Sequence, residues 1–140
     1  MADYHRDCSK IVRNFRNRHR SVNAEIIDPI WINPLDINII KNSVLKTKKL
    51  LIVDNGWVEF GISAEIMAKI YEEIPNQIIQ VARMGFAQTT CPTTKSLEDL
   101  FYPNSKTISN KVCDMLSKTE IDWNRVVINN EELDEFRGPF

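Results

Sequence analysis

The chain has 140 residues, 43% of them hydrophobic, and a formal net charge of −1, values typical of one globular domain rather than a disordered chain. It contains no run of the roughly 20 apolar residues that a membrane span requires, and we expect no secretory signal. Three widely spaced cysteines argue against a disulfide framework or a structural zinc site and predict a reducing compartment, the cytoplasm.

The first half of the chain is predicted to alternate between helix and strand. Residues 7–22 carry a narrow apolar stripe at helical spacing, and residues 24–30 form a short β-branched run that predicts a strand. Asn33 can cap a second helix, and Pro34 suits its first position. The clearest strand covers residues 49–54, because an unbroken apolar run is typical of a parallel strand buried on both faces.

The alternation continues in the second half. Asn55 and Gly56 are expected to end the strand in a loop. A strong helix is predicted over residues 61–73, where isoleucines recur every four residues. The remaining predicted elements are a strand over residues 77–82, an irregular stretch over 85–94, a helical turn over 97–101, a helix over 105–118 and a short strand over 125–128.

This order of elements predicts an α/β fold in which helices cover both faces of a small, mostly parallel sheet, a three-layer α/β/α arrangement. We expect one domain over residues 1–118. An acidic tail over residues 119–140 follows it, and its short strand could pair at an edge of the sheet.

Several segments, in register and in order, resemble one known family. They are residues 24–28 (AEIID), 33–36 (NPLD), 50–57 (LLIVDNGW), 61–66 (GISAEI), 91–94 (CPTT) and 96–103 (SLEDLFYP). Together they resemble the C-terminal domain of transketolase-like proteins. The similarity is strongest to the beta subunit of the decarboxylase component of thiamine diphosphate-dependent 2-oxoacid dehydrogenases, such as the pyruvate or branched-chain enzymes.

The sequence departs from this family's pattern in three places. The apolar strand expected before the first helix is missing, the loop over residues 57–61 lacks a second glycine, and the chain after Lys118 is long. The missing strand would leave an unpaired sheet edge, which predicts that the isolated chain forms a homodimer.

The resemblance implies that this chain has no catalytic, cofactor-binding or metal site of its own. The family binds thiamine diphosphate and Mg²⁺ through a Gly-Asp-Gly segment that closes in Asn-Asn, and the chain lacks the first part. Its one Asn-Asn pair, Asn129 and Asn130, lies in the tail. The cofactor would therefore belong to other domains of the full enzyme. His5, His19 and Cys91 are expected to be ordinary surface residues rather than reactive groups.

Two candidate partner surfaces follow from the resemblance. Asp54, Trp57 and Glu59 lie where the sheet's carboxyl end is expected, and the resemblance implies that this edge meets thiamine-binding domains or an alpha subunit. The structural alternative for Trp57 is that its side chain only caps the core.

The second surface would be acidic. In the dehydrogenase complexes, acidic residues of the beta subunit meet basic residues of the subunit-binding domain of the acyltransferase, and the candidates here are Glu98 and Asp99. Phe140, with the terminal carboxylate, is a further candidate. The alternative for Glu98 and Asp99 is a solvated start of a helix.

The function that the resemblance implies is subunit and domain assembly without catalysis. A different class, a nucleic-acid-binding module, rests on Arg13, Arg16 and Arg20 in the basic N-terminal helix. The scarcity of aromatic residues there and the acidic tail both oppose it. A small independent enzyme is the weakest alternative, because no set of titratable residues converges.

Overall fold

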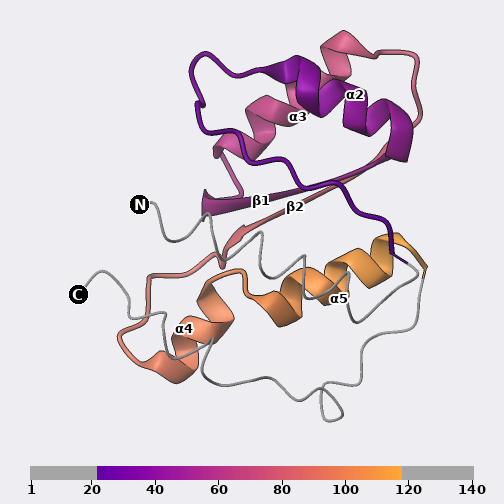
Figure 1. Cartoon of the computed structure of the whole chain (residues 1–140). Helices are drawn as coiled ribbons and strands as arrows, with labels where there is room; N and C mark the ends of the chain where they lie inside the picture. The colour runs from indigo at the N-terminus through magenta and orange to yellow at the C-terminus, as the bar shows by residue number, and fades with distance from the viewer. Residues whose placement is uncertain (1–21, 118–140) are drawn as a thin grey trace.

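The structure, a computed structural model, describes residues 22–117 (Figure 1). Its elements are α2 (Ile37–Thr47), β1 (Lys49–Trp57), α3 (Ile62–Glu73), β2 (Gln80–Phe86), α4 (Lys95–Phe101) and α5 (Ser105–Met115). Within this range no helix is long or apolar enough to cross a membrane.

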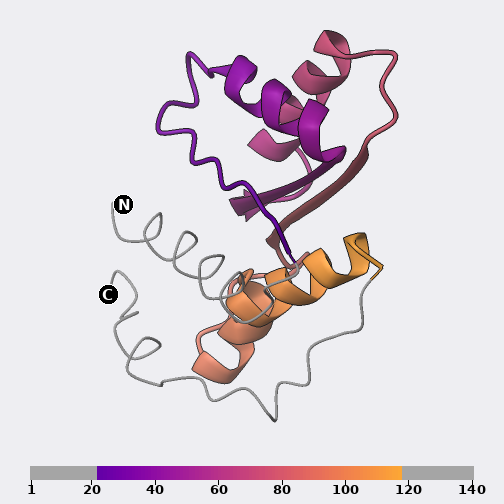
Figure 2. The same ribbon diagram turned by 45° about the vertical axis from the view of Figure 1, so that its right-hand side comes forward.

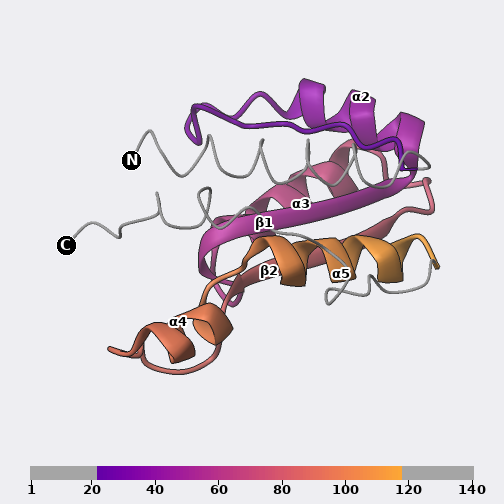
Figure 3. The ribbon, with the colours of Figure 1, turned by 60° about the horizontal axis from the view of Figure 1, so that its bottom comes forward.

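The described residues form a two-stranded parallel sheet between two layers of helices. Helices α2 and α3 cover one face and α5 lies against the other (Figures 1 and 3). Lys49 faces Gln80 at the start of the sheet and Trp57 faces Phe86 at its end, with an irregularity in register between Val53 and Trp57. The predicted α/β class and three-layer order are therefore confirmed.

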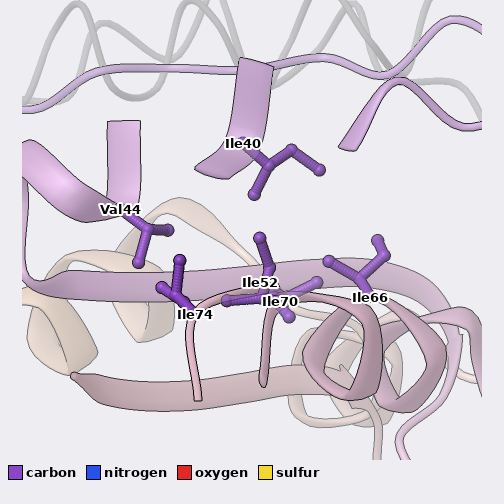
Figure 4. Close-up of a cluster of buried hydrophobic side chains, with 6 residues drawn as sticks. All are labelled: Ile40, Val44, Ile52, Ile66, Ile70 and Ile74. Carbon is purple, nitrogen blue, oxygen red and sulfur yellow. The ribbon is translucent and has the colours of Figure 1, made fainter. Parts of the chain in front are cut away.

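The main core lies between the sheet and the α2–α3 layer. Six buried side chains, five of them isoleucines, fill it (Figure 4): Ile40, Val44, Ile52, Ile66, Ile70 and Ile74. Ile70 is completely buried. Burying an isoleucine stabilises the fold by roughly 1.5–3 kcal/mol. The isoleucines that recur every four residues on α3 therefore contribute much of the free energy that holds this helical layer against the sheet.

A smaller cluster holds α5 in place. Cys113 on α5 is buried against Val22. The side-chain nitrogen of Lys49, at the start of β1, donates to the backbone carbonyl of Met115 at the end of α5. A cation at a helix C-terminus interacts favourably with the helix dipole, so this contact helps to hold the end of α5 against the start of β1.

The start of α2 differs from the prediction. Asp36, not Asn33, is the N-cap, and its carboxylate accepts from the backbone N–H of Asn38 at 3.1 Å. Asn33 and Pro34, joined by a cis peptide bond, instead lie in the turn before the helix. Both positions offered a capping side chain, and the sequence pattern alone could not distinguish them.

The predicted strand over residues 24–30 is wrong. This segment runs as irregular chain from the α5 side of the sheet to the start of α2 (Figure 2). Only Ile27 of its three isoleucines packs against the main core, while Ile26 and Ile30 are exposed. Pro29 also lacks the N–H that a paired strand would donate.

Both described strands end later than predicted. β1 does not end at Asn55 and Gly56 but continues through an irregularity to Trp57, and β2 covers residues 80–86 rather than 77–82. Pairing with the neighbouring strand, which a single strand's pattern does not reveal, sets these limits. Of the helix predicted over residues 7–22 only Val22 is described, and the strand predicted over residues 125–128 and the missing first strand lie outside the described residues.

Candidate functional site

The carboxyl ends of β1 and β2 lie together because the strands are parallel, and the chain leaves them through a loop over residues 58–61 and through α4 (Figure 1). We call these strand ends, the loop and α4 the carboxyl edge. Open α/β sheets place their ligands and partners at this end. Asp54, Trp57 and Glu59 fall here as predicted, and Glu98 and Asp99 lie here on α4.

Asp54 ties the end of β1 to the start of α3. Its half-buried carboxylate accepts hydrogen bonds from the backbone N–H groups of Asn55 and Ile62, the first residue of α3. Burial raises the pKa of Asp54 above its usual value, and the two hydrogen bonds oppose that shift without cancelling it. A carboxylate in this position also complements the positive end of the helix.

Trp57 belongs to an aromatic cluster that attaches α4 to the sheet. Its ring meets Phe86 and Phe101 edge to face, each at 5.8 Å between centroids. Phe101 lies 4.9 Å from Phe86, and Tyr102 packs edge to face against both. The backbone N–H of Ala87 donates to the carbonyl of Phe101 at 3.0 Å. Trp57 nevertheless remains 44% exposed, so it caps this cluster and also presents surface to solvent.

Interactions of its backbone with neighbouring residues hold the loop over residues 58–61 in place. The guanidinium of Arg83 on β2 donates to the carbonyl of Val58 at 2.9 Å. Gly61 is required because a Cβ there would stand 2.0 Å from the carbonyl oxygen of Trp57. Between them, Glu59 is exposed and Phe60 is fully exposed, with a left-handed φ of 59°.

Phe60 and Arg83 were missed by sequence reasoning. The sequence did carry a signal for Phe60, since it is an aromatic residue in a short loop and lies outside the isoleucine repeat of α3. The sequence carried no signal for Arg83, because its hydrogen-bond partner is a backbone carbonyl in a different segment of the chain.

The acidic candidates lie on α4. Asp99 is exposed and Glu98 is half-buried, close enough to Tyr102 that its charge helps to raise the pKa of that phenol. Beside them, Leu97 is 52% and Leu100 75% exposed. The short helix therefore presents apolar and acidic side chains together.

Tyr102 also contacts the exposed Cys91, whose Sγ lies 3.4 Å from the phenol oxygen. The hydrogen bond to this thiol is the largest cause of the raised pKa of Tyr102. The contact fastens the loop after β2 to the end of α4.

Among residues 22–117, no three His, Cys, Asp or Glu side chains gather as they would to hold a metal ion. Phe140 lies outside the described residues.

Comparison with known proteins identifies a family. The model of the family "Transketolase, C-terminal domain" matches residues 6–108. The mitochondrial pyruvate dehydrogenase E1 component subunit beta of Bos taurus is 37% identical over 89 residues, which are 62% of this chain. Those of Saccharomyces cerevisiae and Chaetomium thermophilum are 35% and 34% identical over 98 and 96 residues, 69% and 68% of this chain.

Two earlier expectations change with these matches. The cytoplasmic location is wrong, because these relatives are named as mitochondrial subunits and point away from the cytoplasm. The alternative nucleic-acid role gains no support from the family or from these relatives.

The chain spans about a quarter of the length of the curated relatives that it matches, 25% to 27% of each. The family match itself covers well over half of this chain. The chain therefore belongs to the transketolase C-terminal domain family and is related to beta subunits of pyruvate dehydrogenase E1.

Proposed function

We propose that this chain is an assembly domain of a thiamine diphosphate-dependent 2-oxoacid dehydrogenase of the pyruvate dehydrogenase type. It associates through its carboxyl edge with the thiamine-binding domains or the alpha subunit of that enzyme. It binds no cofactor itself; thiamine diphosphate and Mg²⁺ are held by its partners. The names of its relatives support a mitochondrial location.

One observation carries the proposal: exposed apolar side chains gather on the carboxyl edge. Trp57, Phe60, Leu97 and Leu100 are 44%, 103%, 52% and 75% exposed. The aromatic cluster joins their elements, because Trp57 packs against Phe101 at the end of α4. Large exposed apolar side chains at the end of a sheet where such folds bind their partners support an interaction site, and aromatic residues are enriched at such sites.

A second partner fits the acidic side chains of α4. The exposed Asp99 and the half-buried Glu98 favour a basic surface, and we propose the subunit-binding domain of the acyltransferase as that partner. Phe140 would extend this surface from the C-terminus. The homodimer of the isolated chain stays a prediction. Light scattering, which gives the mass of the chain in dilute solution, tests it, and the mass of a monomer would contradict it.

The test uses the full chain and a yeast pyruvate dehydrogenase E1 whose beta subunit lacks the segment that this chain matches, together with its alpha subunit. The three polypeptides are co-expressed, and the complex is isolated through a tag on the alpha subunit. We expect this chain to co-purify at a fixed stoichiometry and to restore thiamine diphosphate-dependent decarboxylation of pyruvate.

A pair of matched variants tests the surface. Leu100→Asp places a charge on the carboxyl edge. Ile78→Asp places one just before β2, at the opposite end of the sheet, where the side chain is 96% exposed. Loss of co-purification with the first variant and not the second supports the proposal. If the unaltered chain does not co-purify, the proposal is wrong.

A further inference from the structure

Phe60 combines two unfavourable features. Its side chain is 103% exposed, so the largest apolar group in the loop is left entirely in water. Its φ of 59° lies in the left-handed region, which costs a residue with a Cβ roughly 1–2 kcal/mol. Two other non-glycine residues in the described range have positive φ, Lys48 and Ser117, and both follow helices, where this conformation is ordinary. Phe60 has no such explanation.

Neighbouring groups hold the loop on both sides of Phe60. Arg83 holds the carbonyl of Val58, and the carboxylate of Asp54 holds the first N–H of α3. Gly61 lets the chain pass close to the carbonyl of Trp57 where no larger residue would fit. Strained backbone that neighbouring groups hold in place is characteristic of functional sites.

We propose that Phe60 is the anchor residue of the carboxyl edge, which inserts into an apolar pocket of the thiamine-binding partner with a lysine or arginine at the pocket's mouth. The inference rests on the proposed function and specifies which residue makes the contact. Aromatic anchors buried at the centre of an interface contribute a large share of its binding energy.

The nature of the pocket follows from what surrounds Phe60. The exposed Glu59 adjoins it in the chain, and charge complementarity favours a partner with a positive charge beside an apolar cavity. The fixed backbone presents the ring before the partner arrives, which lowers the ordering cost of binding. A partner that met only a flat apolar surface would not require the strained backbone.

The decisive variant is Phe60→Gly, because glycine adopts a left-handed φ without strain and the lost side chain makes no buried contact. We expect the melting temperature to stay the same or rise. We expect affinity for the yeast alpha subunit and shortened beta subunit to fall at least tenfold, which corresponds to about 1.4 kcal/mol. The matched control is Ile78→Gly, which removes an equally exposed apolar side chain from the opposite end of the sheet and should leave affinity unchanged.

Two further variants examine the chemistry. Phe60→Leu keeps apolar bulk and should recover most of the affinity that Phe60→Gly loses. Glu59→Lys should slow association, most strongly at low salt, because it would face a like charge. If Glu59→Lys associates faster than the unaltered chain, the proposal of a basic residue at the mouth of the pocket is wrong.

The outcomes separate this inference from the proposed function. If the unaltered chain does not bind the yeast subunits, the proposed function fails. If the unaltered chain binds and Phe60→Gly binds equally well, the partner interaction stands and the anchor is wrong. A fall in both affinity and melting temperature for Phe60→Gly would show that the ring supports the fold, which also overturns the inference.

Discussion

Replacing Ser63 with alanine should stabilise this protein. Ser63 lies in the first turn of α3, and its side chain is completely buried. Among the residues that the structure describes, its hydroxyl oxygen is the one buried side-chain polar atom without a hydrogen-bond partner. A buried hydroxyl that has given up its bonds to water without replacing them costs free energy in the folded state.

The magnitude follows from three contributions. The unmet hydroxyl costs about 1–3 kcal/mol, which Ser63→Ala removes. Alanine adds up to about 0.5 kcal/mol through its greater helix propensity, although less in a first turn. The space left by one oxygen atom subtracts part of this gain. We therefore expect a net stabilisation of about 1–2 kcal/mol, or a rise in melting temperature of roughly 3–7 °C in a chain of 140 residues.

Guanidinium unfolding of the full chain, followed by circular dichroism, measures this difference. The matched control is Ser43→Ala on α2, where the serine hydroxyl hydrogen-bonds to the carboxylate of Glu25. That control gains the same propensity but loses a contact, so its stability should stay level or fall. If Ser63→Ala proves neutral or destabilising, the hydroxyl is paired in solution and the reasoning is refuted.

Three other predictions concern the carboxyl edge. Gly61→Ala should destabilise the fold by roughly 1–3 kcal/mol in denaturant unfolding, because its Cβ would stand 2.0 Å from the carbonyl oxygen of Trp57; unchanged stability would show that the loop adapts. Because burial raises the folded-state pKa of Asp54, its contribution to stability is fully present below the usual value of 3.8 and is lost as pH rises through the raised one. The stability of the unaltered protein relative to Asp54→Asn should therefore fall as the pH rises above about 3.8, and a rise would contradict this sign. Cys91→Ala should lower the pKa of Tyr102 toward 10.0 in a difference titration of phenolate absorbance, and an unchanged pKa would mean that the thiol contact is absent in solution.

The elements that the sequence predicted well are those with strong local signals. The isoleucine repeat at Ile62, Ile66 and Ile70 requires a helix with one apolar face, and α3 begins and ends close to where that repeat does. The apolar run after Lys49 correctly predicted β1. The segment over residues 24–30 misled because β-branched residues favour a strand only when a partner strand pairs with them.

The candidate site was predictable in position but not in its details. Asp54 and Trp57 follow an obvious strand, and the carboxyl end of a parallel strand is where such folds bind. The aromatic cluster could not be inferred, because Phe86, Phe101 and Tyr102 come from separate parts of the chain and meet only through tertiary packing. The left-handed backbone of Phe60 was equally hidden, since nothing in its neighbours' identities specifies it.

The packing of Trp57 shows why a structural and an interaction role at this edge are compatible. An edge-to-face contact with Phe86 and Phe101 uses part of the indole, and the exposed remainder faces solvent. The same contacts fix α4, so Leu100 and the loop residue Phe60 are carried by one packed unit rather than by two independent segments. A partner that buries both side chains then need not order α4 against the loop, because the aromatic cluster has already done so in the free domain. The core contacts of this edge thus determine the geometry of the surface that we propose it presents.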